Sequence, residues 1–308
     1  MIAVARRHRF SSPKDLATLN EAVELNSDEA NLNLRRRTIS LLPSLFTISA
    51  LAAGLSAIHY AADGRPHVAL ALIGIAAVLD ALDGRIARML GASSKMGEQL
   101  DSLCDAVNFG VTPALVTYFT LFGRDSAPVK DWTWMACVIY SAAIVLRLAR
   151  FNTLLDDEDR PAFHKEFFVG IPAPAAALLS MAPLVAHVKF GPGWWSSPVA
   201  ASLWLVLVAC LAFSKIPTLS MKTVRLRPRL VPALLAIFVV LVALLLTQPL
   251  VTVLILDAIY LAHMPFAMTT YLWLSTTPEA WEANGRERRE IRQAGRKPRR
   301  RPRLRLRP

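Results

Sequence analysis

Cysteine is scarce in this sequence of 308 residues, and the three that occur, Cys104, Cys137 and Cys210, lie far apart in apolar surroundings. They have neither the pairing of a disulfide framework nor the spacing of a zinc site, so we expect small buried side chains. The sequence also lacks a long apolar run within its first 37 residues, where acidic and basic residues mix. This absence argues against a cleaved signal peptide and predicts a cytosolic N-terminal tail.

An aromatic-interleaved basic face, as in nucleic-acid-binding proteins, is absent as well. Lys and Arg number 35 against 23 Asp and Glu, a net charge of +12, but the cations lie mainly in the two tails and in short loops. We therefore expect no nucleic-acid partner. Because 54% of the residues are hydrophobic and the mean hydropathy is +0.39, the composition indicates an integral membrane protein with basic cytoplasmic parts.

Long apolar runs are plentiful, and about eight reach the roughly 20 residues needed to cross a bilayer. They span residues 39–60, 67–87, 100–122, 132–151, 170–190, 198–216, 230–247 and 249–274. The predicted fold class is all-α, a polytopic transmembrane helical bundle. Only Gln248 and Pro249 divide the last two runs, which leaves a tight hairpin and one long kinked helix as alternatives.

The distribution of Lys and Arg predicts the topology, since cytoplasmic loops carry the excess. With the N-terminus inside, the inner loops hold Arg85, Arg88, Lys95, Arg147, Arg150, Arg160, Lys165, Lys215, Lys222, Arg225, Arg227 and Arg229. The outer loops hold only Arg65, Arg124, Lys130 and Lys189. Both termini and the charged end of the second span are therefore expected to face the cytoplasm.

Three regions follow from this pattern: a cytosolic tail over 1–37, a transmembrane catalytic domain over 38–275, and a basic cytosolic tail over 276–308. The arginine-rich end of the second tail has two interpretations. It attaches to anionic membrane lipids, each cation adding about 1 kcal/mol near the surface, or it is a solvated tail that only enforces topology.

Four carboxylates interrupt the apolar pattern between residues 79 and 109. Asp80 and Asp83 are three residues apart at the end of the second span, and Asp101 and Asp105 are four apart at the start of the third. Each pair is expected to project from one helix face, so two antiparallel helices would bring all four together. A single carboxylate inside a membrane costs about 3 kcal/mol, and the cluster therefore predicts a bound cation.

The chemistry of these ligands favours hard divalent cations. Oxygen donors without nearby cysteine or histidine select Mg²⁺, Mn²⁺ or Ca²⁺ over Zn²⁺. Two such ions can hold a pyrophosphate between the carboxylates. Gly84 and Ala87 leave room for a nucleotide, and Arg85 and Arg88 can pair with phosphate oxygens. The alternative is that the aspartates are ordinary interfacial residues paired with Arg88 and Lys95.

A family resemblance rests on the same segment, which fits the signature DxxDGxxARx8GxxxDxxxD. The fixed positions are Asp80, Asp83, Gly84, Ala87, Arg88, Gly97, Asp101 and Asp105. In this signature the chain resembles the CDP-alcohol phosphatidyltransferase family. Members move a phosphatidyl group from a CDP-activated lipid to an alcohol, release CMP and require divalent metal.

Further motifs resemble the bacterial integral-membrane phosphatidylserine synthases of that family. They are DSLCDAVNFGVTPA at 101–114, RLARFN at 147–152, FFVGIPAPAAA at 167–177 and SKIPTLSMK at 214–222. The likeness runs from about residue 41 to 274. It implies CDP-diacylglycerol and L-serine as substrates, a homodimer, and a location in the inner membrane of a bacterium.

The resemblance also implies roles for the residues of the signature. The four aspartates would bind two ions, Mg²⁺ or Mn²⁺, with Ca²⁺ as a non-productive occupant, and Asp105 would be the general base toward the serine hydroxyl. Asp83 and the signature residues Gly84, Ala87, Arg88 and Gly97 would contact the CDP moiety.

The remaining candidates are cytoplasmic-side residues for serine or phosphate. Arg147, Arg150 and Asn152 follow the fourth span, and Lys215 lies in a later loop. The alternative for the arginines is a purely topological role. Glycerol 3-phosphate and inositol phosphate remain alternative acceptors, because the metal signature does not specify the alcohol. A divalent-cation transporter is the alternative from another class, although carriers generally hold their ion near the membrane midplane.

Overall fold

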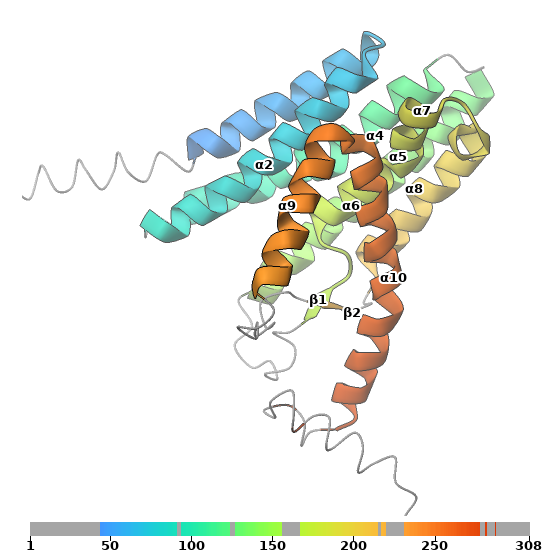
Figure 1. The fold of residues 1–308 in the computed structure, drawn as a ribbon. Helices are drawn as coiled ribbons and strands as arrows, with labels where there is room; N and C mark the ends of the chain where they lie inside the picture. The colour runs from blue at the N-terminus through green and yellow to red at the C-terminus, as the bar shows by residue number, and fades with distance from the viewer. Residues whose placement is uncertain are drawn as a thin grey trace, which may run out of the picture.

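Helices make up almost all of the chain that the structure, a computed structural model, describes: residues 44–90, 94–123, 127–155, 167–214, 217–219, 231–277, 281 and 287. The first helix is Ser44–Ala62. The α-helices that follow are α2 (Pro66–Leu90), α3 (Lys95–Asp105), α4 (Thr112–Thr117), α5 (Ala127–Leu155), α6 (Ala173–Ser180), α7 (Ala182–Phe190), α8 (Pro198–Phe213), α9 (Val231–Thr247) and α10 (Pro249–Ser275). Figure 1 shows these helices packed together as a bundle.

Two π-helices, a 3₁₀ turn and one small sheet complete the described chain. The π-helices are η1 (Ala106–Val111) and η2 (Tyr118–Phe122), and the 3₁₀ turn is η4 (Trp194–Ser196). Strands β1 (Phe167–Val169) and β2 (Pro217–Leu219) pair antiparallel, with Phe167 opposite Leu219. The helical prediction is confirmed, and this short pair beside α10 is the one addition to it among the described residues.

The predicted spans correspond to helices. Five are long and apolar enough to cross a membrane: Ser44–Ala62, Pro66–Ile86, Val129–Thr153, Ala173–Phe190 and Pro249–Ser275. Two shorter apolar helices, α8 and α9, lie within the predicted spans at 198–216 and 230–247. The remaining run, 100–122, is helical throughout but passes through α3, η1, α4 and η2.

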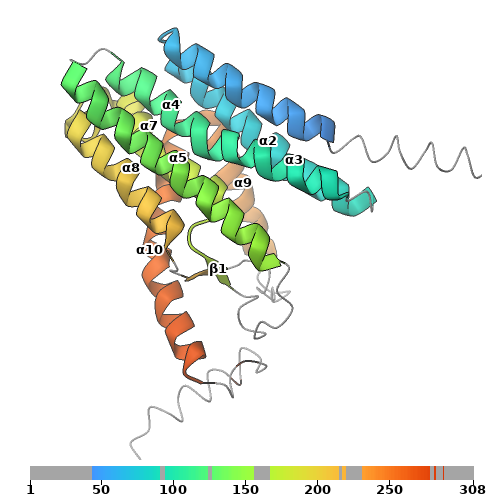
Figure 2. The same ribbon diagram turned by 180° about the vertical axis from the view of Figure 1, so that it is seen from behind.

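Local sequence explains the turn between the first two helices. Gly64 has a φ of +73°. Its N–H donates to the carbonyl of Ala61, and the N–H of Arg65 donates to the carbonyl of Tyr60. This is the Schellman ending, in which glycine accepts the left-handed conformation. Pro66 then begins α2, where its missing N–H is not needed. The two helices therefore run antiparallel, side by side (Figure 2).

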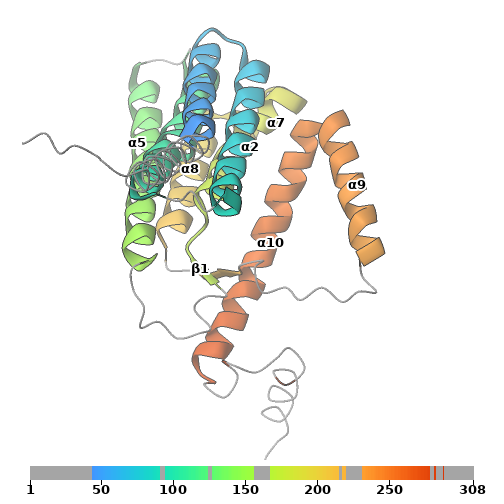
Figure 3. The same ribbon diagram turned by 90° about the vertical axis from the view of Figure 1, so that its left-hand side faces the viewer.

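The last two helices form a hairpin, which settles the alternative left open by the sequence. Gln248 alone separates α9 from α10, and the Lys189 ammonium at the end of α7 donates to its Oε1 at 2.7 Å. Figure 3 shows α9 standing apart from the other helices and joined to the bundle through α10. No residue of α9 is buried.

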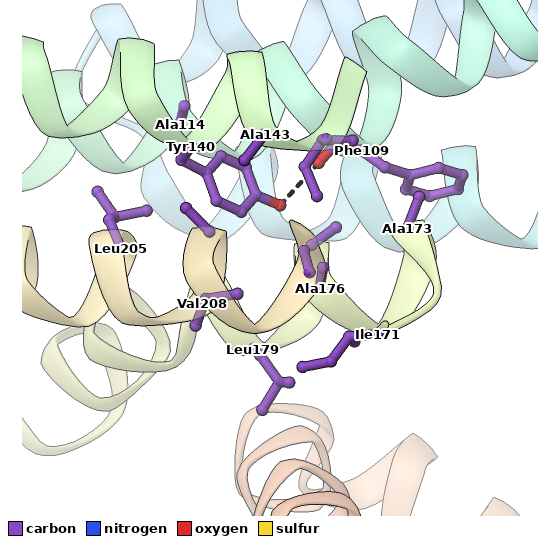
Figure 4. Packing of buried hydrophobic residues seen from close by; sticks show 14 of the residues in the cluster. Phe109, Ala114, Tyr140, Ala143, Ile171, Ala173, Ala176, Leu179, Leu205 and Val208 are labelled. Carbon is purple, nitrogen blue, oxygen red and sulfur yellow. Dashed lines mark hydrogen bonds between the residues drawn. The ribbon is translucent and has the colours of Figure 1, made fainter. Parts of the chain in front are cut away.

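The main core lies where α5 packs against α8, α6 and η1. Tyr140 of α5 is at its centre and is fully buried (Figure 4). Its hydroxyl donates to the carbonyl of Phe109 at 2.8 Å. That carbonyl lies four residues before Pro113, which has no N–H to offer it. The tyrosine thus satisfies a carbonyl that the proline leaves without a helical donor.

A second side chain of α5 supports the same segment. Ser141 donates to the carbonyl of Gly110 at 3.1 Å. Gly110 also lies so close to Ile144 that an added Cβ would be 3.4 Å from its side chain. Since η1 begins directly after Asp105, these contacts fix the backbone that carries this carboxylate.

Replacing Tyr140 with Phe tests this support. The change leaves the buried Phe109 carbonyl without a donor, so we expect the free energy of unfolding to fall by about 1–3 kcal/mol. Thermal unfolding of the detergent-extracted protein measures the effect. Tyr60→Phe is the control, because the Tyr60 hydroxyl bonds to no residue that the structure describes. Equal melting temperatures for the two variants would contradict the assignment.

Candidate active site

Three of the four predicted carboxylates converge where the end of α2 meets α3. One oxygen each of Asp80, Asp101 and Asp105 lies within 4.8 Å of the others. Asp80 comes from α2, whereas Asp101 and Asp105 are one turn apart on α3 and share a face. The spacing of these aspartates in the sequence therefore lets two helices contribute to one cluster of oxygen atoms.

The fourth carboxylate, Asp83, lies beside this cluster and is turned toward the first helix. Thr47 donates its hydroxyl to Asp83 Oδ2 at 2.6 Å, and Asp83 is only 3% exposed. Its other oxygen, Oδ1, is buried and has no hydrogen-bond partner among the described residues. Asp83 still interacts electrostatically with the three clustered carboxylates. One of its oxygens is thus held by Thr47, and the other is available.

The cluster has more buried acceptors than donors. Oδ1 of Asp80, of Asp83 and of Asp105 has no hydrogen-bond partner in the part of the chain that the structure describes. The described Lys and Arg nitrogens all lie more than 4.0 Å from these carboxylates. Buried anions without counter-charge are unfavourable, and their oxygens match the ligands of hard divalent cations. The residues present therefore fit a divalent metal.

An open backbone surface and a cation adjoin the cluster at the end of α2. A Cβ added to Gly84 would meet only the guanidinium nitrogens of Arg88, at 3.9 Å and 4.0 Å. Arg88 is exposed and interacts electrostatically with Asp101. A phosphate can therefore approach the helix backbone at Gly84 while pairing with Arg88. The side chain of Ala87 lies outside the described part of the structure.

Gly97 has a local structural role at the start of α3. Its N–H donates to Ser94 Oγ at 3.0 Å, which caps the helix. A Cβ at Gly97 would lie 3.2 Å from the same oxygen. The glycine therefore permits the cap on the helix that carries Asp101 and Asp105.

The residues of α5 that were predicted to bind serine or phosphate differ in their surroundings. Arg147 is 6% exposed and interacts electrostatically with Asp105. Its Nε is buried and has no hydrogen-bond partner in the described part of the chain. Arg150 instead donates to the carbonyl of Ser214 at 3.1 Å. Asn152 is exposed and donates to Ser102 of α3 at 3.0 Å. Of these three, Arg147 alone interacts electrostatically with a carboxylate of the cluster. Lys215 lies outside the described residues.

Two residues near the site, and one buried carboxylate elsewhere on α10, were not found from the sequence. Thr47 holds Asp83, Tyr260 of α10 interacts electrostatically with Arg147, and Asp257 of α10 is 6% exposed. Asp257 had a detectable signal, because it is the one charged residue in the apolar run 249–262. Thr47 and Tyr260 had no signal in the sequence, because their contacts depend on which helices pack against one another in the fold.

Comparisons with known proteins agree with this geometry. Residues 40–278 match the family model described as CDP-alcohol phosphatidyltransferase. The chain is 43% identical over 264 residues to the CDP-diacylglycerol–serine O-phosphatidyltransferase of Mycobacterium leprae (strain TN), covering 85% of this chain and 86% of the relative. It is 42% identical over 259 residues to the protein of that name from Mycobacterium tuberculosis (strain ATCC 25618 / H37Rv), covering 84% and 89%.

A metal-binding measurement tests the carboxylate cluster without an activity assay. We expect Asp101→Asn to weaken Mn²⁺ binding about ten-fold or more, because the site loses a charged oxygen ligand. Electron paramagnetic resonance of free Mn²⁺ reports the affinity. Asp131→Asn is the matched control, since Asp131 is an exposed carboxylate of α5. An unchanged affinity in Asp101→Asn would show that the cluster does not hold the ion.

Proposed function

Because the chain belongs to the CDP-alcohol phosphatidyltransferase family, we propose that it transfers a phosphatidyl group from CDP-diacylglycerol to the hydroxyl of L-serine. The products are phosphatidylserine and CMP. The observation that carries this proposal is the convergence of Asp80, Asp101 and Asp105 next to Gly84 and Arg88. The names of the relatives support serine as the acceptor.

The proposed cofactor is Mg²⁺ or Mn²⁺ in a two-metal site, with Ca²⁺ as a non-productive occupant. Asp80, Asp83, Asp101 and Asp105 would hold the ions. Bound divalent ions neutralise charge on a pyrophosphate and stabilise the negative charge that develops at the phosphorus. Asp83 suits this role through Oδ1, because Thr47 occupies Oδ2.

The donor nucleotide is proposed to lie over the end of α2. Arg88 would pair with its phosphate oxygens, and Gly84 would let it approach the backbone. Asp83, Ala87 and Gly97 complete the proposed CDP contacts. In this proposal the lipid-linked β-phosphorus would lie near Asp105, the last residue of α3 before η1.

Asp105 is the proposed general base. It accepts the proton of the acceptor hydroxyl as the oxygen bonds to the lipid-linked phosphorus, and the bond between that phosphorus and the oxygen of CMP breaks. Its surroundings support this role, because Asp105 interacts electrostatically both with the other carboxylates and with the buried cation Arg147. Proton transfer by such a group typically contributes a factor of about 10²–10⁴ to the rate.

The cellular setting is proposed from the topology and the relatives. The chain is an integral membrane protein. We place it in the inner (plasma) membrane of a bacterium, with residues 38–275 as the catalytic domain and with both tails and the site facing the cytoplasm. We also propose a homodimer, on the family resemblance. Serine and CMP would then exchange directly with the cytosol.

Transfer of label from several acceptors tests the reaction. Purified protein is supplied with CDP-diacylglycerol, Mn²⁺ and one radiolabelled acceptor: L-serine, glycerol 3-phosphate or inositol phosphate. We expect lipid product and stoichiometric CMP from serine alone. Product from another acceptor only would reject serine. Ion flux into vesicles without CMP release would instead support a transporter.

Asp105→Asn tests the proposed base. We expect kcat to fall by roughly 10²–10⁴-fold, since the amide cannot accept the hydroxyl proton. Asp131→Asn, an exposed carboxylate of α5, is the control and is expected to retain full turnover. Size-exclusion chromatography of both variants checks folding. Normal turnover by a folded Asp105→Asn protein would contradict the mechanism.

A further inference from the structure

Hydrogen bonds from four side chains of α5 to the helical run 100–122 share one antiparallel register. As the residue number falls along α5, the number of its partner rises along the other run. The pairs are Asn152 with Ser102, Ser141 with Gly110, Tyr140 with Phe109 and Cys137 with Ala114. Asp105 and Arg147 fall between the first pair and the other three. The register therefore places them at the same level, which agrees with their electrostatic interaction.

α3 carries two of the clustered carboxylates but has little apolar packing to hold it. Cys104 is the one buried residue of this helix, and Met96 and Leu103 are largely exposed. Asp101 and Asp105 of α3 also repel Asp80 of α2. When no cation is bound, this repulsion acts to move α3 away from α2, and the apolar contacts of α3 resist it weakly.

The pair of Asn152 and Ser102 lies on the side of Asp105 that faces away from η1. Asn152 Nδ2 donates to Ser102 Oγ at 3.0 Å, and the same Oγ lies 3.5 Å from Asn152 Oδ1. Ser102 directly follows Asp101 in the sequence. The other three pairs are on η1 and α4, beyond Asp105. Asn152 thus holds the part of α3 that those three pairs do not reach.

We infer that Asn152 is a positioning residue for the metal site. By holding α3 against α5 through Ser102, it keeps Asp101 and Asp105 in place for the ions and keeps Asp105 level with Arg147. This inference rests on the proposed function, because it concerns the metal site of the same reaction. It gives Asn152 a role that differs from direct contact with serine or phosphate.

The chemistry of an amide suits this role. An amide both donates and accepts hydrogen bonds, so it can pair with a hydroxyl in either direction. It also carries no charge. A carboxylate at position 152 would add negative charge near Asp101, and an ammonium group there would compete with the metal ions for the carboxylates. A neutral pair therefore fastens α3 without disturbing the charge balance of the cluster.

A double-mutant cycle on Mn²⁺ affinity tests the inference. Asn152→Ala and Ser102→Ala each remove the same hydrogen bond, so each should weaken Mn²⁺ binding roughly two- to ten-fold. The double variant should bind Mn²⁺ no more weakly than either single variant, because one bond can be lost only once. Electron paramagnetic resonance of free Mn²⁺ with the full-length, detergent-extracted protein gives the affinities. Losses that multiply in the double variant would contradict the inference.

Thr153→Ala is the matched control for this cycle. Thr153 is the exposed neighbour of Asn152, and its hydroxyl donates to the carbonyl of Arg150 within α5. The change removes a polar side chain from the same turn without removing a bond to α3. We expect the Mn²⁺ affinity of Thr153→Ala to equal that of the unaltered protein. An equal loss in Thr153→Ala and Asn152→Ala would show that the bond to Ser102 is not the cause.

Steady-state kinetics separate positioning from contact with the acceptor. At saturating Mn²⁺ we expect Asn152→Ala and Ser102→Ala to keep the KM for serine of the unaltered protein. At limiting Mn²⁺ both should lose activity in proportion to their weaker metal binding. A higher KM for serine at saturating Mn²⁺ in Asn152→Ala, but not in Ser102→Ala, would overturn the inference and would indicate that Asn152 contacts serine.

The inference and the proposed function fail in different measurements. If the unaltered protein binds Mn²⁺ but transfers nothing to serine, the proposed function is wrong, and the Mn²⁺ cycle still decides the inference. If the unaltered protein uses serine while Asn152→Ala binds Mn²⁺ with full affinity, the inference alone is wrong.

Discussion

Mutual repulsion among carboxylates is the constraint around which this protein is organised. Asp80, Asp101 and Asp105 present oxygens within 4.8 Å of one another, and Asp83 adds a fourth charge beside them. In surroundings of low polarity such a set is stable only with a cation at its centre. The fold therefore keeps a high-energy arrangement ready for a metal and a phosphate, and α2 and α3 must be held firmly enough to resist separation.

Helices distant in the sequence hold the carboxylate-bearing segments in place. Thr47 of the first helix holds Asp83, and Tyr140 and Ser141 of α5 supply hydrogen bonds to η1, the segment that follows Asp105. A π-helix widens the backbone and exposes carbonyls, and it frequently occurs at functional sites. Here α5 satisfies those carbonyls on one side and presents Arg147 to the site nearer its other end. One helix thus both supports the backbone that follows Asp105 and supplies the buried cation.

The sequence predicted the helices, the membrane class and the carboxylate cluster, because hydropathy and helical spacing are local properties. It was less successful where the outcome depends on neighbouring helices. Asp83 was expected to join Asp80, yet residues three apart differ by about 60° around a helix axis, and Thr47 draws Asp83 aside. Arg147 and Arg150 diverge for the same reason, since Arg150 turns to the end of α8. The hairpin of α9 and α10 could not be chosen from the sequence, because it depends on contacts such as that of Gln248 with α7.

The exposed position of α9 has a consequence for how its sequence can change. Every residue from Val231 to Thr247 is at least partly exposed, and the helix packs mainly on α10. In an integral membrane protein an exposed apolar helix of this kind suits contact with hydrocarbon chains, which adapt their shape to any apolar surface. Leucine, isoleucine, valine and phenylalanine are therefore nearly interchangeable along this helix. Among natural variants we expect the shapes of its side chains to differ widely, while the side chains stay apolar. The small residues where the first helix packs against η1 follow the opposite rule, because at Gly54 even one added methyl group would collide with Asn108.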